Sequence, residues 1–167
     1  TAFHQTMEPV EYLYALPYEY YEKYAVRRYG AHGTSHKYLS QVVNEEYLAG
    51  KEHTRIITLH IGSGASVSAV KDGKCIATSM GLTPLAGVMM GTRTGDIDPS
   101  CMPYLCQCTG KTVDEMYDIY NKKSGLLGVS GISNDTRDVE KAYFEGDERA
   151  KIAVELFANR IAEYIMM

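Results

Sequence analysis

The chain has 167 residues, of which 45% are hydrophobic and 23% are charged, a balance typical of a soluble globular protein of about one domain. Its 17 Lys and Arg against 21 Asp and Glu leave a net charge of −4, which provides no basic surface for nucleic acid or an anionic membrane. No apolar run reaches the roughly 18 residues of a membrane span, and no signal-peptide pattern opens the sequence. We therefore expect a cytoplasmic protein without nucleic-acid or membrane partners.

Two helices are predicted in the first third of the chain. The stretch 17–26 begins with proline at a favoured first helical position, which indicates a short helix. Glycines interrupt the pattern at 30–33. Thr34 or Ser35 then caps a second helix, whose apolar residues recur at helical spacing as far as Gly50. The many tyrosines of this region favour half-buried packing over stacking on bases.

A strand-like pattern follows. Three short β-rich runs occupy residues 55–61, 65–70 and 74–79. Asp72 and Gly73 form a preferred two-residue hairpin turn between the second and third runs. The glycine loop at 62–64 joins the first two runs. The pattern therefore predicts an antiparallel three-stranded meander.

Loops and then helices are predicted after the meander. The loops lie at 82–85 and 91–95. The expected helices run from Asp98 or Pro99 to about Cys108, from Thr112 with its capping-box partner Glu115 to about Asn121, from Asn134 or Asp135 to Phe144, and from about Asp147 onward. Gly125, Gly128 and Gly131 mark a second glycine-rich stretch. The residues alone thus indicate one compact α/β unit.

The loop between the first two strands is the first candidate for chemistry. It reads His60-Ile61-Gly62-Ser63-Gly64. Glycines let backbone N–H groups approach a phosphate closely, and successive amides of such a turn form an anion-binding concavity. A tight hairpin with glycine at positive-φ positions explains the same segment equally well.

Two side chains on glycine-flanked segments are further candidates. His32 precedes a predicted helix N-terminus, a favourable place to contact an anion, although a plain surface histidine is the alternative. Arg93 presents a planar donor set between two glycines, and a structural salt bridge with Asp96 or Asp98 is its alternative.

No metal site is predicted. Cys75, Cys101, Cys106 and Cys108 lack a C-x-x-C spacing, which leaves them as thiols. His32 and His36 have the spacing of a metalloprotease pair, but Gly33 replaces the required glutamate and disfavours a helix through both.

Taken together, the segments read R-R-Y-G-A-H-G-T-S-H-K-Y, H-I-G-S-G-A-S, M-G-T-R-T-G-D-I-D-P, N-K-K-S-G-L-L-G-V-S-G and S-N-D-T-R-D. In this order they resemble the acetate kinase (acetokinase) family across practically the whole chain. The resemblance implies a member of the actin, Hsp70 and sugar-kinase superfamily with a partial ribonuclease-H-like α/β domain. It also implies a homodimeric enzyme that transfers a phosphoryl group between ATP and acetate, in line and with Mg²⁺.

The resemblance also assigns site residues. It makes His32 and Arg93 the two transition-state stabilisers, and loose phosphoryl-transfer transition states do need positioned cations and donors. It makes His60-Ile61-Gly62-Ser63-Gly64 the second phosphate loop and places Asp135-Thr136-Arg137 in the nucleotide site. The catalytic aspartate is expected just before Thr1, and the Mg²⁺ ligands are expected outside this segment.

The chain is therefore expected to be an internal segment, inactive on its own. Residues 1–30 would end the first domain and its connection, and residues 31–167 would begin the second, nucleotide-binding domain. Ser63 replaces the asparagine that the family usually has in this loop, which leaves pyrophosphate open as a donor beside the favoured ATP.

The sequence leaves two alternative functions open. One is a non-catalytic ATP-binding module of the actin-like superfamily. The other is a kinase for another short carboxylate such as propionate or butyrate, decided by the apolar lining of the acid pocket, for which Val10 and Pro84 are candidates.

Overall fold

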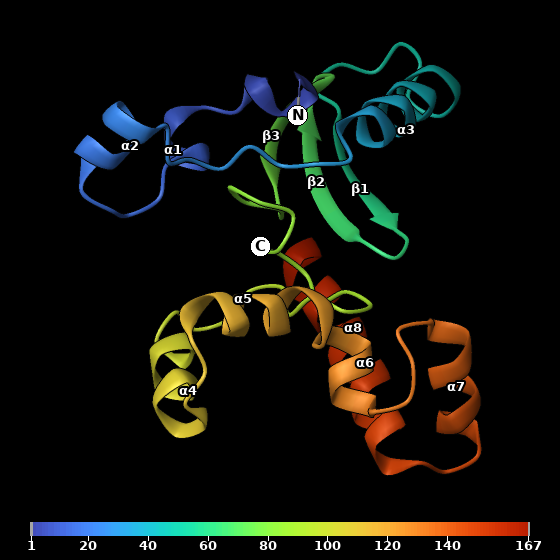
Figure 1. Ribbon diagram of the computed structural model, residues 1–167. Coiled ribbons are helices and arrows are strands. Elements are labelled where there is room, and N and C mark those ends of the chain that lie inside the picture. Colours follow the sequence, from blue (N-terminus) through green and yellow to red (C-terminus); the bar gives the residue numbers. More distant parts are fainter. Residues whose placement is uncertain (1, 167) are drawn as a thin grey trace. The chain divides into compact units, whose positions relative to one another are not determined.

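The computed structural model describes residues 2–166 (Figure 1). These residues form two compact units, one made of the chain up to residue 61 with residues 66–87, the other of residues 62–65 with the chain from residue 88 on. The single unit indicated by the length is wrong, because each part buries a core of its own. Val67 and Val70 are buried in the first unit, and Leu126 and Val139 in the second.

The first unit combines the three-stranded sheet with the N-terminal helices (Figure 1). Its elements are the 3-10 helix η1 (Ala2–Thr6), α1 (Pro9–Tyr12), α2 (Tyr18–Tyr24), α3 (Gly33–Glu46), β1 (Arg55–Ile61), β2 (Ala65–Lys71) and β3 (Lys74–Thr78). The sheet order is β1-β2-β3, with α3 packed against β1 and η1 against β3.

The predicted meander is confirmed, and its turn explains the pairing. Asp72 and Gly73 have φ angles of 50° and 76°, and a type I′ hairpin turn requires positive φ at both central positions. The turn sets Lys71 opposite Lys74 in the antiparallel pair β2–β3, and an irregularity in register follows between Ala69 and Val70. β2 is the central strand, so its serine side chains are buried and need partners within the protein.

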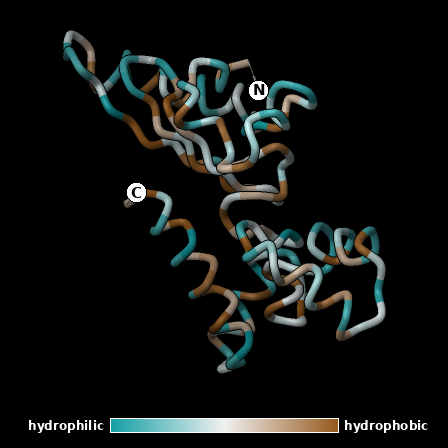
Figure 2. The backbone as a smooth tube through the Cα atoms, turned by 90° about the vertical axis from the view of Figure 1, so that its left-hand side faces the viewer, coloured by the Kyte–Doolittle hydropathy of each residue, from teal (hydrophilic) through white to brown (hydrophobic). Residues whose placement is uncertain are grey.

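The second unit is helical (Figure 1). Its helices are α4 (Cys101–Thr109), α5 (Val113–Lys122), α6 (Gly125–Ser130), α7 (Thr136–Phe144) and α8 (Glu148–Met166). Helix α8 packs on α6 and α7 around Met89, Leu126, Val139, Ala150 and Ala153. Hydrophobic and hydrophilic residues alternate along α8, the helix that ends at the C-terminus in Figure 2, as an amphipathic helix requires. Within residues 2–166, no helix has both the length and the apolar character that crossing a membrane requires.

The predicted caps of two helices are confirmed. Thr112 and Glu115 form the reciprocal capping box at the start of α5. Asp135 caps α7 by accepting a hydrogen bond from the backbone N–H of Arg137. Both caps rely on contacts within three residues, which is why the sequence reveals them.

Three other boundaries differ from the prediction. Helix α3 begins at Gly33 with His32 as N-cap, because the hydroxyl of Ser35, one of the expected caps, is bonded to His60 instead. The helix also ends at Glu46 rather than at Gly50. Helix α4 begins only at Cys101, because the Asp98 carboxylate accepts a hydrogen bond from the backbone N–H of Ser100 and residues 98–100 form a turn before the helix.

The glycine-rich stretch at 125–131 forms a helix that the sequence analysis missed. Glycine disfavours helices by about 1 kcal/mol relative to alanine. The side chain of Leu126 is only 2% exposed, however, and α6 packs along α8. Tertiary packing therefore outweighs local propensity here.

Candidate functional site

His32 is held in an unusual conformation at the start of α3. Its φ of 58° lies in the left-handed region, which a non-glycine residue adopts at a cost of about 1–2 kcal/mol. Ser66 on β2 fixes the ring through a 2.8 Å hydrogen bond to Nδ1. The ring also stacks on His60 of β1, with 4.0 Å between centroids and 23° between planes. Two strands of the sheet thus fix the predicted catalytic histidine.

His36 lies one turn further along α3 and is fully buried. Its Nε2 is 2.8 Å from the same Ser66 hydroxyl, and its Nδ1 is 2.8 Å from the Thr58 hydroxyl. Burial, together with smaller contributions from the neighbouring His4, His32 and His60, lowers the pKa of His36 to about 4. His36 is therefore neutral at pH 7.

Two further histidines complete what we call the histidine cluster, which consists of His4, His32, His36 and His60. The ring of His60 stacks on that of His32, and the Nδ1 atom of His60 is 3.0 Å from the Ser35 hydroxyl. His4 donates from Nε2 to the carbonyl of Ala31 at 2.9 Å, and its Nδ1 is 3.2 Å from the thiol of Cys75. Burial raises the pKa of that thiol to about 12 and lowers the pKa of His4, so it disfavours the charged form of both groups.

The glycine loop after β1 lines a separate hollow within the second unit. This hollow has a volume of about 200 Å³. It is lined by Gly62, Ser63, Gly91, Leu126, Asn134, Asp135, Thr136 and Phe157. A Cβ on Gly91 would lie 2.9 Å from the backbone oxygen of Asn134, so the two chain segments approach closely only because residue 91 is glycine. The structure thus brings Ser63 together with Asp135 and Thr136.

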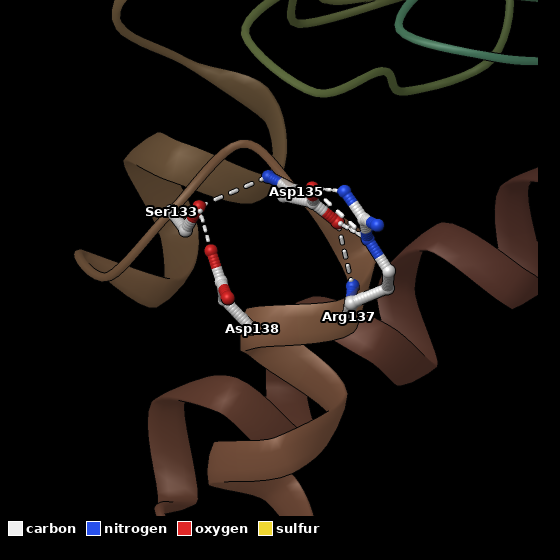
Figure 3. Close-up of polar contacts among 4 residues, drawn as sticks. All are labelled: Ser133, Asp135, Arg137 and Asp138. Atoms are coloured by element: carbon white, nitrogen blue, oxygen red, sulfur yellow. Dashed lines mark hydrogen bonds and ion pairs between the residues drawn. The ribbon is translucent and has the colours of Figure 1, made fainter.

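Asp135 and Arg137 form a tight charged pair at the start of α7 (Figure 3). The guanidinium Nε lies 2.9 Å from one carboxylate oxygen of Asp135 and 3.2 Å from the other. The hydrogen bonds from Arg137 lower the pKa of Asp135 to about 2. Ser133 extends the network by donating to Asp138 and accepting from the N–H of Asp135. Arg137 is 85% exposed, which presents its charge to solvent in a fixed position.

Arg93 lies on a loop that backbone hydrogen bonds join to α5 and α6. The bonds run from Leu126 N–H to the Met90 carbonyl (2.9 Å), from Leu127 N–H to Gly91 (3.0 Å), from Ser124 N–H to Thr92 (2.9 Å) and from Thr94 N–H to Tyr120 (3.0 Å). The side chain of Arg93 is half-buried, with Nη1 3.5 Å from the Met90 sulfur. These backbone bonds fix the loop that carries Arg93.

Sequence reasoning missed Ser66, which lies between His32 and His36. His32 is the left-handed N-cap of α3 and His36 lies in its first turn, and the rings of both histidines contact the Ser66 hydroxyl. Ser66 lies 34 and 30 positions away in the sequence, so no local signal identifies it.

A metal site does not emerge from this part of the chain. Among residues 2–166, no group of three or more His, Cys, Asp or Glu side chains is placed to hold a metal ion.

Comparisons with known proteins give a consistent result. A sequence model described as "Acetokinase family" matches residues 1–167. "Acetate kinase" of Geobacillus sp. (strain WCH70) is 59% identical over 165 residues, which are 99% of this chain and 42% of that protein. The chain thus spans about two fifths of the length of the curated relatives it matches.

Two solved structures share the fold. The Porphyromonas gingivalis acetate kinase structure matches with a TM-score of 0.95 and 48% identity, covering 99% of this chain and 41% of that one. A propionate kinase structure from Francisella tularensis subsp. tularensis SCHU S4 matches with a TM-score of 0.93 and 48% identity, covering 99% of this chain and 42% of that one. The predicted fold class is confirmed: a partial α/β domain of the ribonuclease-H-like, actin-like ATPase type, with an antiparallel meander followed by helices.

Proposed function

The chain belongs to the acetokinase family, and from this premise we propose that the protein transfers the terminal phosphoryl group of ATP to acetate. The reaction is reversible, gives acetyl phosphate and ADP, and proceeds by direct in-line transfer. The observation that carries the proposal is the hollow where the glycine loop meets the start of α7. A non-catalytic ATP-binding module is not favoured, because the family match extends over the whole chain.

We propose that the hollow binds nucleotide phosphates. Backbone N–H groups of a glycine loop and of a helix N-terminus favour anions. Arg137 already neutralises the carboxylate of Asp135, so that carboxylate does not repel a phosphate. The volume of about 200 Å³ is below the roughly 300–1,000 Å³ of complete ligand pockets, so the hollow holds only part of a nucleotide. We assign Gly62, Ser63 and Gly64 to the phosphates.

The remaining assigned residues complete this proposal. Asp135, Thr136 and Arg137 bind the nucleotide beside the phosphates. His60 and Ile61 end strand β1, and we propose that they set the direction in which the phosphate loop leaves the sheet.

His32 and Arg93 are proposed to stabilise the transition state. A loose, metaphosphate-like transition state spreads negative charge over the equatorial oxygens, so catalysis depends on positioned positive charge and hydrogen-bond donors. The fold fixes both residues. The ring of His32 is held by Ser66 and His60, and the loop that carries Arg93 is held by backbone hydrogen bonds. Such fixed donors need little reorganisation during the reaction.

Further features of the protein are proposed from the family. Mg²⁺ would neutralise phosphate charge when bound, and we place its ligands outside this segment, as the resemblance to the family implies. We also propose that the protein is a cytoplasmic homodimer. Residues 1–30 would end the first domain and its connection, and residues 31–167 would begin the nucleotide-binding domain.

The function is tested by trapping acetyl phosphate as its hydroxamate during incubation of the intact protein with ATP, Mg²⁺ and acetate. Parallel reactions contain propionate or butyrate, because the propionate kinase structure matches this chain as well as an acetate kinase structure does. We expect the highest kcat/KM with acetate. Higher kcat/KM with propionate would establish the second candidate function. Nucleotide binding without transfer to any of these acids would establish a non-catalytic module.

The donor is tested at Ser63. We expect Ser63→Asn to shift the ratio of kcat/KM for ATP over pyrophosphate about fivefold toward ATP, since a longer amide reaches donor oxygens that the hydroxyl does not, and one hydrogen bond is worth about 1 kcal/mol. Ser100→Asn, at an exposed position outside the hollow, is the matched control. A ratio unchanged by Ser63→Asn would exclude this residue from donor selection.

A further inference from the structure

One buried hydroxyl lies between two histidines. Ser66 is fully buried on β2, and its Oγ is 2.8 Å from His32 Nδ1 and 2.8 Å from His36 Nε2. A hydroxyl has a single proton, so it donates to one of these nitrogens and accepts from the other. The direction of the two bonds therefore decides which ring nitrogen of His32 carries a proton.

The far end of the network sets this direction. The Thr58 hydroxyl donates to the backbone carbonyl of Ser68 at 3.3 Å, so it accepts from His36 Nδ1–H at 2.8 Å. Neutral His36 has only one N–H, so its Nε2 accepts from the Ser66 O–H. Ser66 in turn accepts from His32 Nδ1–H. We call this chain from His32 through Ser66, His36 and Thr58 to Ser68 the hydroxyl relay.

The reverse direction satisfies fewer groups. In the reverse direction, the Thr58 hydroxyl would donate to His36 Nδ1 and would lose its hydrogen bond to the Ser68 carbonyl. When His32 is charged, its imidazolium donates from both nitrogens. In the reverse direction Ser66 would then accept from both histidines, and its own proton would lose the acceptor on His32. The relay in the forward direction accommodates both protonation states of His32.

The relay also requires a neutral His36. A charged His36 would donate from both nitrogens and would turn the Ser66 proton toward His32. The titratable groups around His36 are His4, His32 and His60, and each of them opposes a charge on it, as burial does. The titratable groups around His32 include His60, stacked on its face, and His36, which His32 meets through Ser66.

We propose that Ser66 and His36 are positioning residues that keep the proton of neutral His32 on Nδ1. Nε2 is then the nitrogen that gains a proton when His32 ionises, and it donates to the transferring phosphoryl group only in the charged form. This last step rests on the proposed function, whereas the position of the proton does not. Deprotonation of His32 removes the donor, so turnover falls as the pH rises through that titration.

The position of the proton is measured by NMR on the intact, ¹⁵N-histidine-labelled protein. We expect neutral His32 to show the Nδ1–H tautomer, and Ser66→Ala to convert it to the Nε2–H tautomer that free imidazole side chains prefer. An Nε2–H tautomer in the unmodified protein would overturn the proposal. This measurement decides the relay even if Ser66→Ala does not fold, and also if the protein proves not to phosphorylate acetate.

Kinetics test the link to catalysis. Ser66→Ala is expected to lower kcat about 10- to 100-fold, the range for one hydrogen bond to a charged group, with KM for ATP and acetate little changed. Its loss of turnover at alkaline pH becomes shallower, because neutral His32 then carries a proton on Nε2. Ser66→Thr, which keeps the hydroxyl, restores the steeper profile.

Ser68→Ala is the matched control. Ser68 is equally buried on the same strand, and its hydroxyl bonds to Thr78 rather than to a histidine. We expect its pH profile and its His32 tautomer to match those of the unmodified protein. Equal losses of kcat in Ser66→Ala and Ser68→Ala, with unchanged pH profiles, would reduce Ser66 to a packing role and overturn the proposal.

Discussion

Arg93→Ala in the intact protein is expected to lower kcat for acetyl phosphate formation by about 10³- to 10⁵-fold, the range for an arginine that stabilises phosphoryl transfer. The guanidinium offers several donors in a fixed plane to the equatorial oxygens, where charge is spread in the transition state. Because this benefit arises mainly in the transition state, KM for ATP should change little. Steady-state kinetics with saturating acetate measure both quantities.

The structure allows this substitution to be interpreted. Backbone bonds from α5 and α6 hold residues 91–94, so truncating the side chain of Arg93 leaves the loop in place. Arg93→Lys keeps the charge but loses the planar donor set, and we expect it to recover only part of the lost turnover. Arg160→Ala, which removes an exposed arginine paired with Glu163 on α8, serves as the control with near-normal turnover. Near-normal turnover in Arg93→Ala would remove Arg93 from its proposed role.

Local signals in the sequence predicted much of the fold. Asp72 and Gly73 predicted the hairpin turn because type I′ geometry restricts both positions to a few residue types. The capping box of Thr112 and Glu115 predicted the start of α5 for a similar reason, since its bonds span only three residues. Helix α6 escaped prediction because its stability comes from α8, more than twenty residues away along the chain for most of its length.

In the candidate site, too, some residues are recognisable from local sequence signals and others only from the fold. The glycines of the phosphate loop and the cap at Asp135 are recognisable in the sequence, and the structure brings their residues to one hollow. The surroundings of His32 are different. They depend on a left-handed backbone, a stacked ring from β1 and a hydroxyl from β2, which only the folded sheet brings together. His32 and His36 share one serine because the left-handed N-cap and the first turn of α3 both face β2 at Ser66.

Gly125→Ala is expected to produce the largest loss of stability among single alanine substitutions at the glycines of the second unit. Gly125 has φ +61°, and a Cβ there would lie 2.0 Å from the Met90 carbonyl oxygen and 2.8 Å from that of Arg93. Real Cβ atoms do not approach backbone oxygen so closely, and neither oxygen lies at the end of a flexible side chain. Either the Arg93 loop or the start of α6 must therefore move.

The expected cost follows from two contributions. The left-handed backbone alone costs a non-glycine residue about 1–2 kcal/mol. Displacing the loop also breaks the bond from Leu126 N–H to the Met90 carbonyl and disturbs the packing of a core leucine. We expect a total loss of about 3–5 kcal/mol in the free energy of unfolding, a range reserved for substitutions with such a specific structural cause. Urea unfolding followed by circular dichroism measures it.

Gly110→Ala separates the two contributions. Gly110 has nearly the same backbone conformation, with φ +70° at the end of α4, but a Cβ there meets nothing within 4 Å. Its substitution should therefore cost only the backbone term of about 1–2 kcal/mol and leave kcat unchanged. Gly125→Ala should lower kcat even in the folded fraction, because the loop that positions Arg93 has moved. Equal losses of stability in the two variants, with normal kcat in both, would contradict the close packing of the Arg93 loop against α6.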